Sequence, residues 1–155
     1  MATIELSIAI LAAPSQVWTY LADIRRRPEW MSGIDNLEAA SESTRGVGAA
    51  FRMVSRGPFG IKVYDDLVCT KWEDDEVLAM ERRGSIKGKN AFYLVPIELG
   101  SRVQLKEELC MPLGLLGELV FHLLFRRHLR RTLSQDIWNL KALVEERQDK
   151  DGPVV

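Results

Sequence analysis

Apolar and polar residues alternate along most of the first 111 positions, a pattern that predicts strands with one buried face. Between residues 3 and 11, every second residue is an isoleucine or a leucine. Successive side chains of a strand point to opposite faces, so this spacing predicts one apolar and one polar face. Six further strands are predicted between turns rich in glycine, proline or acidic residues, at residues 36–42, 49–55, 61–72, 77–83, 89–95 and 102–111.

Helical spacing replaces alternation directly after the first strand. Apolar residues recur there three and four positions apart, at Val17, Trp18, Leu21 and Ile24. Pro14 or Ser15 suits the first turn of such a helix. The run of three arginines and Pro28 at residues 25–28 is expected to break it, because a residue before proline avoids the helical region. A second short helix is then expected to start at residues 29–31.

The last third of the chain is predicted to form one long helix, over residues 112–147, with two different halves. The second half carries a single apolar stripe, formed by Leu129, Leu133, Ile137, Leu140 and Val144. The first half, residues 113–125, is apolar on nearly every side, and only Glu118 and His122 interrupt it. A helix that is apolar all round needs a cover, which can be a core, a ligand, a partner or lipid.

Strands followed by one long helix predict an α+β architecture, in which the helix covers one face of an antiparallel sheet. The chain has 155 residues, so we expect a single domain at residues 1–148 and a flexible tail at 149–155. It has 21 basic and 22 acidic residues, and this balance argues against a nucleic-acid partner.

Cysteine and histidine usage limits the chemistry further. Cys69 and Cys110 lie far apart and resemble neither a disulfide framework nor a metal site, which favours reduced thiols in a cytoplasmic protein. Residues 109–125 are too short and too polar to span a membrane. With two histidines and no phosphate-binding loop or nucleophile elbow, we expect no metal and no cofactor.

Several short motifs occur along the chain in an order that is typical of one protein superfamily. They are PSQVW at 14–18, LAD at 21–23, PEW at 28–30, GVG at 46–48, FYLVP at 92–96, GSRV at 100–103 and LKALVE at 140–145. Together they resemble the START-like, polyketide cyclase/dehydrase-type superfamily (SRPBCC, Bet v 1-like). The resemblance implies a helix-grip fold, in which a seven-stranded antiparallel sheet wraps around a long C-terminal helix and two short helices follow strand 1.

The same resemblance implies a pocket between sheet and helix. Its members include pollen-allergen-like binders, lipid carriers, coenzyme Q-binding proteins and aromatic polyketide cyclases. They share a cavity rather than one catalytic motif, so the fold alone does not define the function. We expect binding or transport of a hydrophobic or aromatic small molecule, such as a lipid, a polyketide or a quinone-like compound.

Three polar residues are candidates to orient such a ligand. Glu107 interrupts an apolar row, where burial would raise its pKa; alternatively, the row reaches the sheet edge and Glu107 is solvated or paired with an arginine. His122 lies on an apolar helix face, where it could pair with Glu107 as a general base, although a satisfied core histidine is the commoner case. Tyr64 offers a hydroxyl on the strand face opposite Asp65.

Large apolar residues are expected to shape the pocket, although each one taken singly is more often a core residue. They are Trp30, Phe51, Met53, Phe92, Leu94, Leu115 and Leu119.

Two other functions remain open. The first is a cyclase or dehydratase that uses Glu107 or His122 as acid or base. The second is an interaction protein, monomer or homodimer, in which residues 113–125 dock on a partner or on a second copy. The basic run at 126–131, extended by residues 25–27 if they lie close, would suit peripheral contact with an anionic membrane, but a solvated helix face is the favoured interpretation.

Overall fold

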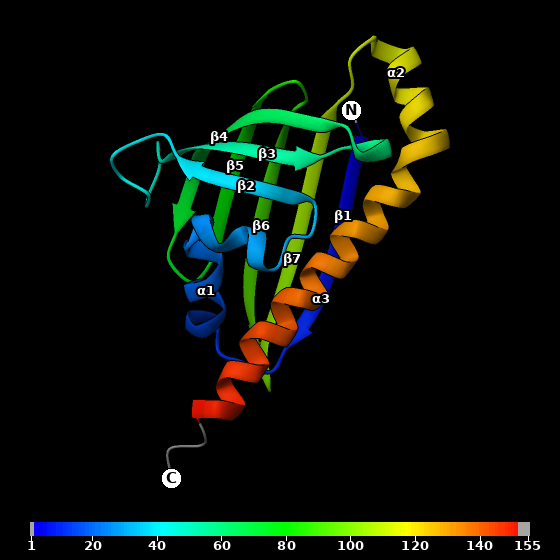
Figure 1. Cartoon of the computed structure of the whole chain (residues 1–155). Helices are drawn as coiled ribbons and strands as arrows, with labels where there is room; N and C mark the ends of the chain where they lie inside the picture. Colours follow the sequence, from blue (N-terminus) through cyan, green and yellow to red (C-terminus); the bar gives the residue numbers. More distant parts are fainter. Residues whose placement is uncertain (1, 152–155) are drawn as a thin grey trace.

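A computed structural model describes residues 2–151, which form an antiparallel sheet with a long C-terminal helix laid across it (Figure 1). The sheet order is β1-β7-β6-β5-β4-β3-β2, so the first and last strands of the chain pair with each other. This confirms the predicted α+β helix-grip fold. The seven strands are β1 (Ala2–Ile10), β2 (Ile34–Ala39), β3 (Ala50–Arg56), β4 (Lys62–Glu73), β5 (Val77–Gly84), β6 (Lys87–Ile97) and β7 (Gly100–Cys110).

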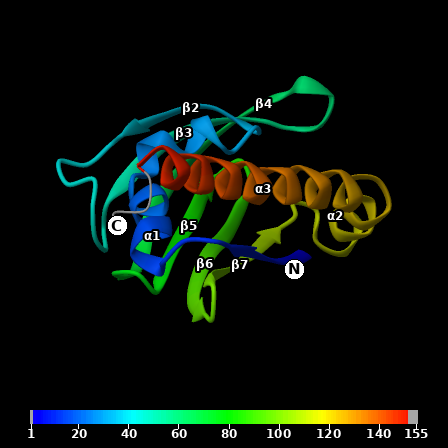
Figure 2. The same cartoon turned by 90° about the horizontal axis from the view of Figure 1, so that it is seen from below.

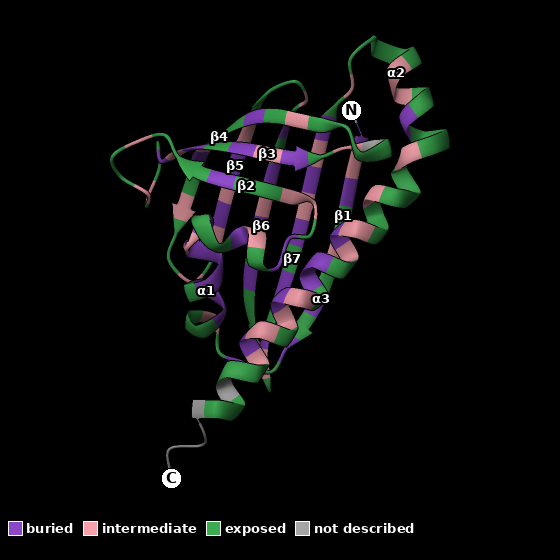
Figure 3. Cartoon of the chain, viewed as in Figure 1, coloured by how far each residue is buried: buried purple, intermediate pink, exposed green. Residues whose placement is uncertain are grey.

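Alternation of side chains gives the sheet one buried, concave face. In β1, Ile4 and Ile8 are buried whereas Glu5 and Ser7 are exposed. In Figure 3, buried residues (purple) recur along the strands between exposed and intermediate ones. Figure 2 shows the C-terminal helix running across the concave face, with the short helix after β1 beside it. The core therefore lies between the sheet and these helices.

The helical segment after β1 differs from the prediction. Helix α1 (Pro14–Ala22) was expected, and it buries Val17, Trp18 and Leu21. Two short helices follow strand 1 as expected, but the break lies at Asp23 and not at residues 25–28, because one 3-10 helix, η1 (Ile24–Glu29), runs through the arginines and Pro28. A 3-10 helix has three residues per turn, so Ile24, Arg27 and the following Trp30 share one side. All three are buried.

The C-terminal helix runs without interruption through three segments. They are α2 (Gly114–Val120), a π-helical turn η3 (Phe121–Phe125) and α3 (Arg126–Asp151). The predicted stripe is confirmed, since Leu133, Ile137, Leu140 and Val144 are buried and Leu129 is partly buried. The helix continues beyond residue 147, into the expected tail; residues 152–155 of that tail lie outside the described residues.

Polar contacts fix the second half of this helix over the sheet. Asp136 accepts hydrogen bonds from the Ser32 amide and hydroxyl, both at 2.8 Å. Asn139 Nδ2 donates to the Trp30 carbonyl at 3.1 Å. Burial raises the pKa of Asp136, and the Ser32 bonds oppose that rise. The segment that follows η1 is thereby tied to α3.

The first half of the helix has a different environment. Of α2 and η3, only Phe121 is buried; it packs with Ala2 and Leu109. The helix projects beyond the end of β7 (Figure 1). The enclosure that the apolar composition predicts is therefore not provided by the described residues of this chain.

Two further expectations concern a membrane-spanning helix and the two cysteines. Within residues 2–151, no helix is long and apolar enough to cross a membrane. Cys69 is buried and Cys110 exposed, and neither of these described cysteines forms a disulfide.

Candidate functional site

A row of directly paired residues crosses the concave face and carries polar groups at its centre. The strand register places Ile4 opposite Glu107, Glu107 opposite Asn90, Asn90 opposite Met80, and Met80 opposite Cys69. All five are buried. The neighbouring row, which includes Leu105 paired with Phe92, is apolar. The sheet therefore holds a carboxyl group and an amide side by side in an apolar surface.

Arg27 reaches this surface from η1. Its residue exposure is only 2%. Its guanidinium carbon lies 5.2 Å from the centre of the Phe92 ring, and its Nη1 donates a long hydrogen bond of 3.5 Å to Asn90 Oδ1. Trp30 packs edge-on against the same Phe92 ring, at 5.8 Å between ring centres.

Buried nitrogen atoms at this point lack acceptors. Among the described residues, no hydrogen-bond partner contacts Arg27 Nε, Arg27 Nη2 or Trp30 Nε1. A buried N–H that is left unpaired costs about 1–3 kcal/mol, and more for a charged group. The burial of these donors therefore carries a desolvation cost that a hydrogen-bond acceptor would offset.

Asn90 connects the guanidinium to Glu107. Its Nδ2 donates a short hydrogen bond of 2.6 Å to Glu107 Oε2, while its Oδ1 accepts from Arg27. Burial raises the pKa of Glu107, against the opposing effects of the Asn90 bond and of the Arg82 and Arg27 charges. We call Arg27, Asn90 and Glu107 the internal polar cluster.

An ion pair flanks the cluster toward the end of β5. Arg82 Nε lies 2.9 Å from Asp65 Oδ2, and Arg82 Nη2 donates to Ser55 Oγ at 3.2 Å. The side chain of Asp65 is fully buried. Arg82 Nε and Asp65 Oδ2 do not align as a hydrogen bond, but at 2.9 Å the Asp65 carboxylate offsets the Arg82 charge directly.

Arg27 stays charged at neutral pH in spite of its burial. Desolvation lowers its pKa to about 10, and the negative charge of Glu107 opposes this. A buried cation with free donors can bind a carbonyl, carboxylate or phenolate oxygen strongly, because charge-assisted hydrogen bonds gain strength in a dry environment. The cluster thus combines apolar surroundings with hydrogen-bond donors that suit one oxygen-containing group.

Several sequence-predicted residues lie in the same core as the cluster. Trp30 and Phe92 contact each other beside Arg27. Glu107 points inward and is buried, as one of its two interpretations requires. Three more of the predicted pocket residues are buried in the same core: Phe51, Met53 and Leu94.

The other predicted residues lie elsewhere. Tyr64 is exposed on the face opposite the buried Asp65. Leu115, Leu119 and His122 are exposed on the projecting helix, away from the core. The suggested pairing of His122 with Glu107 is wrong, because Glu107 accepts from Asn90 and the Nδ1 atom of His122 lies 3.2 Å from Arg126 Nη1. Ligand contact by the exposed four stays a prediction.

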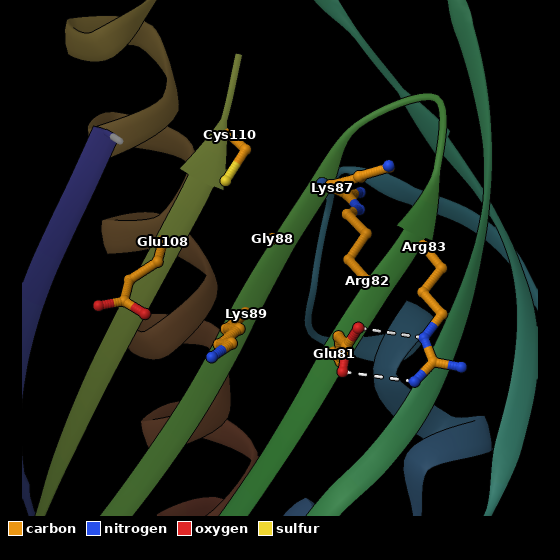
Figure 4. Close-up of a pocket in the computed structure, with 8 residues that line it drawn as sticks. All are labelled: Glu81, Arg82, Arg83, Lys87, Gly88, Lys89, Glu108 and Cys110. Atoms are coloured by element: carbon orange, nitrogen blue, oxygen red, sulfur yellow. Dashed lines mark hydrogen bonds and ion pairs between the residues drawn. The ribbon is translucent and has the colours of Figure 1, made fainter. Parts of the chain in front are cut away.

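A shallow groove of about 400 Å³ lies on the opposite, outer face of the sheet. Figure 4 shows Arg83 bound to Glu81 beside Lys89 and Glu108 on this face, whereas Arg82 turns inward to its partner Asp65. Opposite charges alternate there, as on a solvated surface. Its lining comprises Glu81, Arg82, Arg83, Lys87, Gly88, Lys89, Glu108 and Cys110. It does not correspond to the internal pocket that the sequence predicts.

Metal binding has no obvious location in the part of the chain that the structure describes. Nowhere in residues 2–151 do three histidine, cysteine or acidic side chains converge as ligands.

Sequence reasoning missed Arg27 and Asn90. Arg27 belongs to a run of three arginines, which resembles a surface segment. The signal that could have found it is the spacing of three from Ile24 to Arg27 to Trp30. Asn90 stands at a buried position of β6, four residues before Leu94 and on the same face. Alternation alone identifies that face, but the partner on β7 depends on the register.

Comparison with known proteins identifies the family. A family model described as polyketide cyclase/dehydrase and lipid transport matches residues 1–145. The chain belongs to this family. No functionally curated protein matches the sequence at a significant level. The match spans nearly the whole chain, from β1 into α3.

Solved structures with this fold superpose over most of the chain. The protein TTHA0849 from Thermus thermophilus has a TM-score of 0.80 at 17% identity, over 95% of this chain and 99% of its own. Zhui aromatase/cyclase from a Streptomyces species gives 0.77 at 14%, over 94% of each chain. A START superfamily protein from Mycobacterium smegmatis gives 0.73 at 15%, over 94% and 99%. At these identities the similarity establishes the fold alone.

Proposed function

We propose that this protein binds a hydrophobic small molecule that carries an oxygen function, between the concave face of the sheet and the helices that cover it. The single observation that carries the proposal is the buried guanidinium of Arg27, whose Nε and Nη2 have no acceptor among the described residues. Apolar burial supplies most of the affinity, and Arg27 orients the ligand by its oxygen.

The family match supports the same class of ligand. Its description covers both cyclisation of polyketides and lipid transport, and both kinds of substrate join apolar carbon to carbonyl or carboxylate oxygen. A lipid carrier and a cyclase would therefore need the same two features. This chain provides them as the apolar core around Phe92 and the donors of Arg27.

Calorimetric titration with 2-naphthoate, a bicyclic aromatic carboxylate, tests the proposal. We expect Arg27→Met to weaken binding by about tenfold or more, because a hydrogen bond to a charged group contributes about 1.5–3 kcal/mol. Native mass spectrometry of the freshly purified protein, before the titration, will reveal any apolar molecule that co-purifies and would occupy the site.

Arg52→Met is the matched control, because Arg52 is exposed on β3. It should leave naphthoate binding unchanged. If Arg27→Met unfolds, Arg27→Lys keeps the charge but loses the planar fork, and it should bind naphthoate more weakly than the wild type. Equal affinity of the wild type and either folded Arg27 variant would contradict the proposal.

A cyclase or dehydratase is the second candidate, and the environment of Glu107 favours it. Burial raises the pKa of this carboxyl beside the proposed oxygen site, which is how proteins prepare an acid or base for neutral pH. Glu107→Gln would then keep naphthoate binding while abolishing turnover of a poly-β-ketone substrate. Turnover that survives in Glu107→Gln would eliminate this role.

A further inference from the structure

The first half of the C-terminal helix presents an apolar surface to solvent. Leu115 on α2 has an exposure of 86%, and six more large apolar residues between Leu113 and Leu124 are exposed. Monomeric proteins rarely expose so many neighbouring large apolar side chains unless these form a contact site. The seven are Leu113, Leu115, Leu116, Leu119, Val120, Leu123 and Leu124.

A second segment extends the same surface. The connection between β3 and β4, which includes η2 (Pro58–Gly60), places Phe59 edge-on to Phe125, with 6.2 Å between ring centres. Phe59 is 93% exposed, and Ile61 beside it is exposed too. Figure 1 shows this connection next to the projecting helix. We call these seven residues, together with Phe59 and Ile61, the apolar tip.

Positive charge gathers next to the tip at the start of α3. The four arginines at the start of α3 border it, and we call them the basic collar: Arg126, Arg127, Arg130 and Arg131. Between residues 113 and 131, Glu118 is the sole acidic residue, although the whole chain has a net charge of −1. An apolar end followed by a cluster of arginines matches the order of acyl chains and anionic headgroups in a membrane leaflet.

The geometry points to an anionic lipid surface as the occupant of the tip. The apolar tip enters the boundary between headgroups and acyl chains, and the basic collar binds the lipid phosphates. Of the arginines 25–27, suggested as part of the same patch, Arg27 does not join it because it is buried, and Arg26 pairs with Glu29 at 2.9 Å.

Charge favours lipid over a second copy of the chain. A second copy of the chain would bring to the contact the same four arginines and, within residues 113–131, a single acidic residue, so it offers apolar cover with little opposite charge. A membrane with anionic lipid offers apolar cover and opposite charge together. The inference concerns the outer surface only, so it does not depend on the internal polar cluster.

Flotation of the full chain with lipid vesicles tests this inference. One set contains phosphatidylcholine alone, and the other contains about 30% phosphatidylglycerol. We expect binding to the anionic vesicles and much weaker binding to the neutral ones. The double variant Arg127→Gln/Arg131→Gln should lower the partition coefficient about 30-fold, since each arginine near the surface contributes about fivefold.

Neutral substitutions in the tip test the apolar part without adding charge. Leu115→Ser/Leu119→Ser should reduce vesicle binding by about tenfold or more. The matched control is Leu99→Ser/Val47→Ser, which alters two exposed apolar residues in other connections and should bind like the wild type. For the arginines, Arg52→Gln/Arg102→Gln removes two exposed charges elsewhere and is also expected to bind normally.

Three results would overturn the inference. One is the absence of binding to anionic vesicles by the folded wild type. Another is equal binding to both vesicle types. The third is a concentration-dependent dimer that Leu115→Ser/Leu119→Ser abolishes, which would assign the tip to a second copy. Naphthoate titration of the same variants reports on the internal site separately, so a failure here is distinct from a failure of the proposed function.

Discussion

Three consecutive arginines illustrate how local geometry assigns different roles to one residue type. Arg26 pairs with Glu29 in solvent, whereas Arg27, one position later, is buried over Phe92. The 3-10 geometry of η1 causes this, because it aligns Arg27 with the buried Ile24 and Trp30. A buried charge requires compensation, and Glu107 supplies it through Asn90.

The raised pKa of Glu107 predicts how stability depends on pH. A carboxyl whose pKa is higher in the folded state binds protons more tightly there, so the free energy of unfolding falls as pH rises from 4.5 through the raised value. Glu107→Gln should therefore show a smaller fall than the wild type in urea unfolding between pH of about 4.5 and 8.

Asp136, whose pKa is also raised, contributes with the same sign, so part of the fall persists in that variant. Glu42→Gln, on an exposed loop residue, is the control and should follow the wild-type profile. Parallel profiles for Glu107→Gln and the wild type would show that the carboxyl does not titrate as its burial implies.

At the scale of elements, the C-terminal helix has one anchored half and one projecting half. Leu140 is fully buried against the core, whereas Leu119 in the same helix is 55% exposed. Leu140→Ala should lower the free energy of unfolding by about 2–5 kcal/mol, because it leaves a cavity in the core. Leu119→Ala should change it by only about 0.5 kcal/mol.

Urea unfolding followed by circular dichroism measures both variants under one protocol. The pair share the same chemistry and the same helix, so the comparison isolates burial. A loss for Leu119→Ala as large as that for Leu140→Ala would mean that the tip packs on the chain in solution.

The same two halves of the helix show which features the sequence predicts and which it does not. Alternation predicts the strands, and the spacing of Leu133 to Val144 predicts the buried stripe, because each pattern follows directly from backbone geometry. The composition of residues 113–125 predicts that something shields their apolar side chains from water, but it does not distinguish a core, a ligand, a partner and lipid. Arg27 and Asn90 escape detection since their contact depends on a 3-10 turn and on strand register, which join residues 63 positions apart.

For the whole molecule, the two proposed sites differ chiefly in how strongly dissolved ions screen their charges. The basic collar lies at the surface, so counter-ions screen it, whereas Arg27 is enclosed and is screened much less. Raising NaCl from about 0.05 M to about 0.5 M should therefore weaken binding to anionic vesicles steeply, while naphthoate affinity should change little.

Vesicle flotation and calorimetry on one preparation, at matched salt concentrations, check this prediction. A parallel fall of both affinities would place naphthoate at the exposed arginines instead of at Arg27, and would contradict the internal site. Vesicle binding that resists salt would instead leave apolar insertion as the whole interaction and remove the role assigned to the basic collar. Divergence of the two affinities is the result that both proposals require, because one charge lies in solvent and the other in the core.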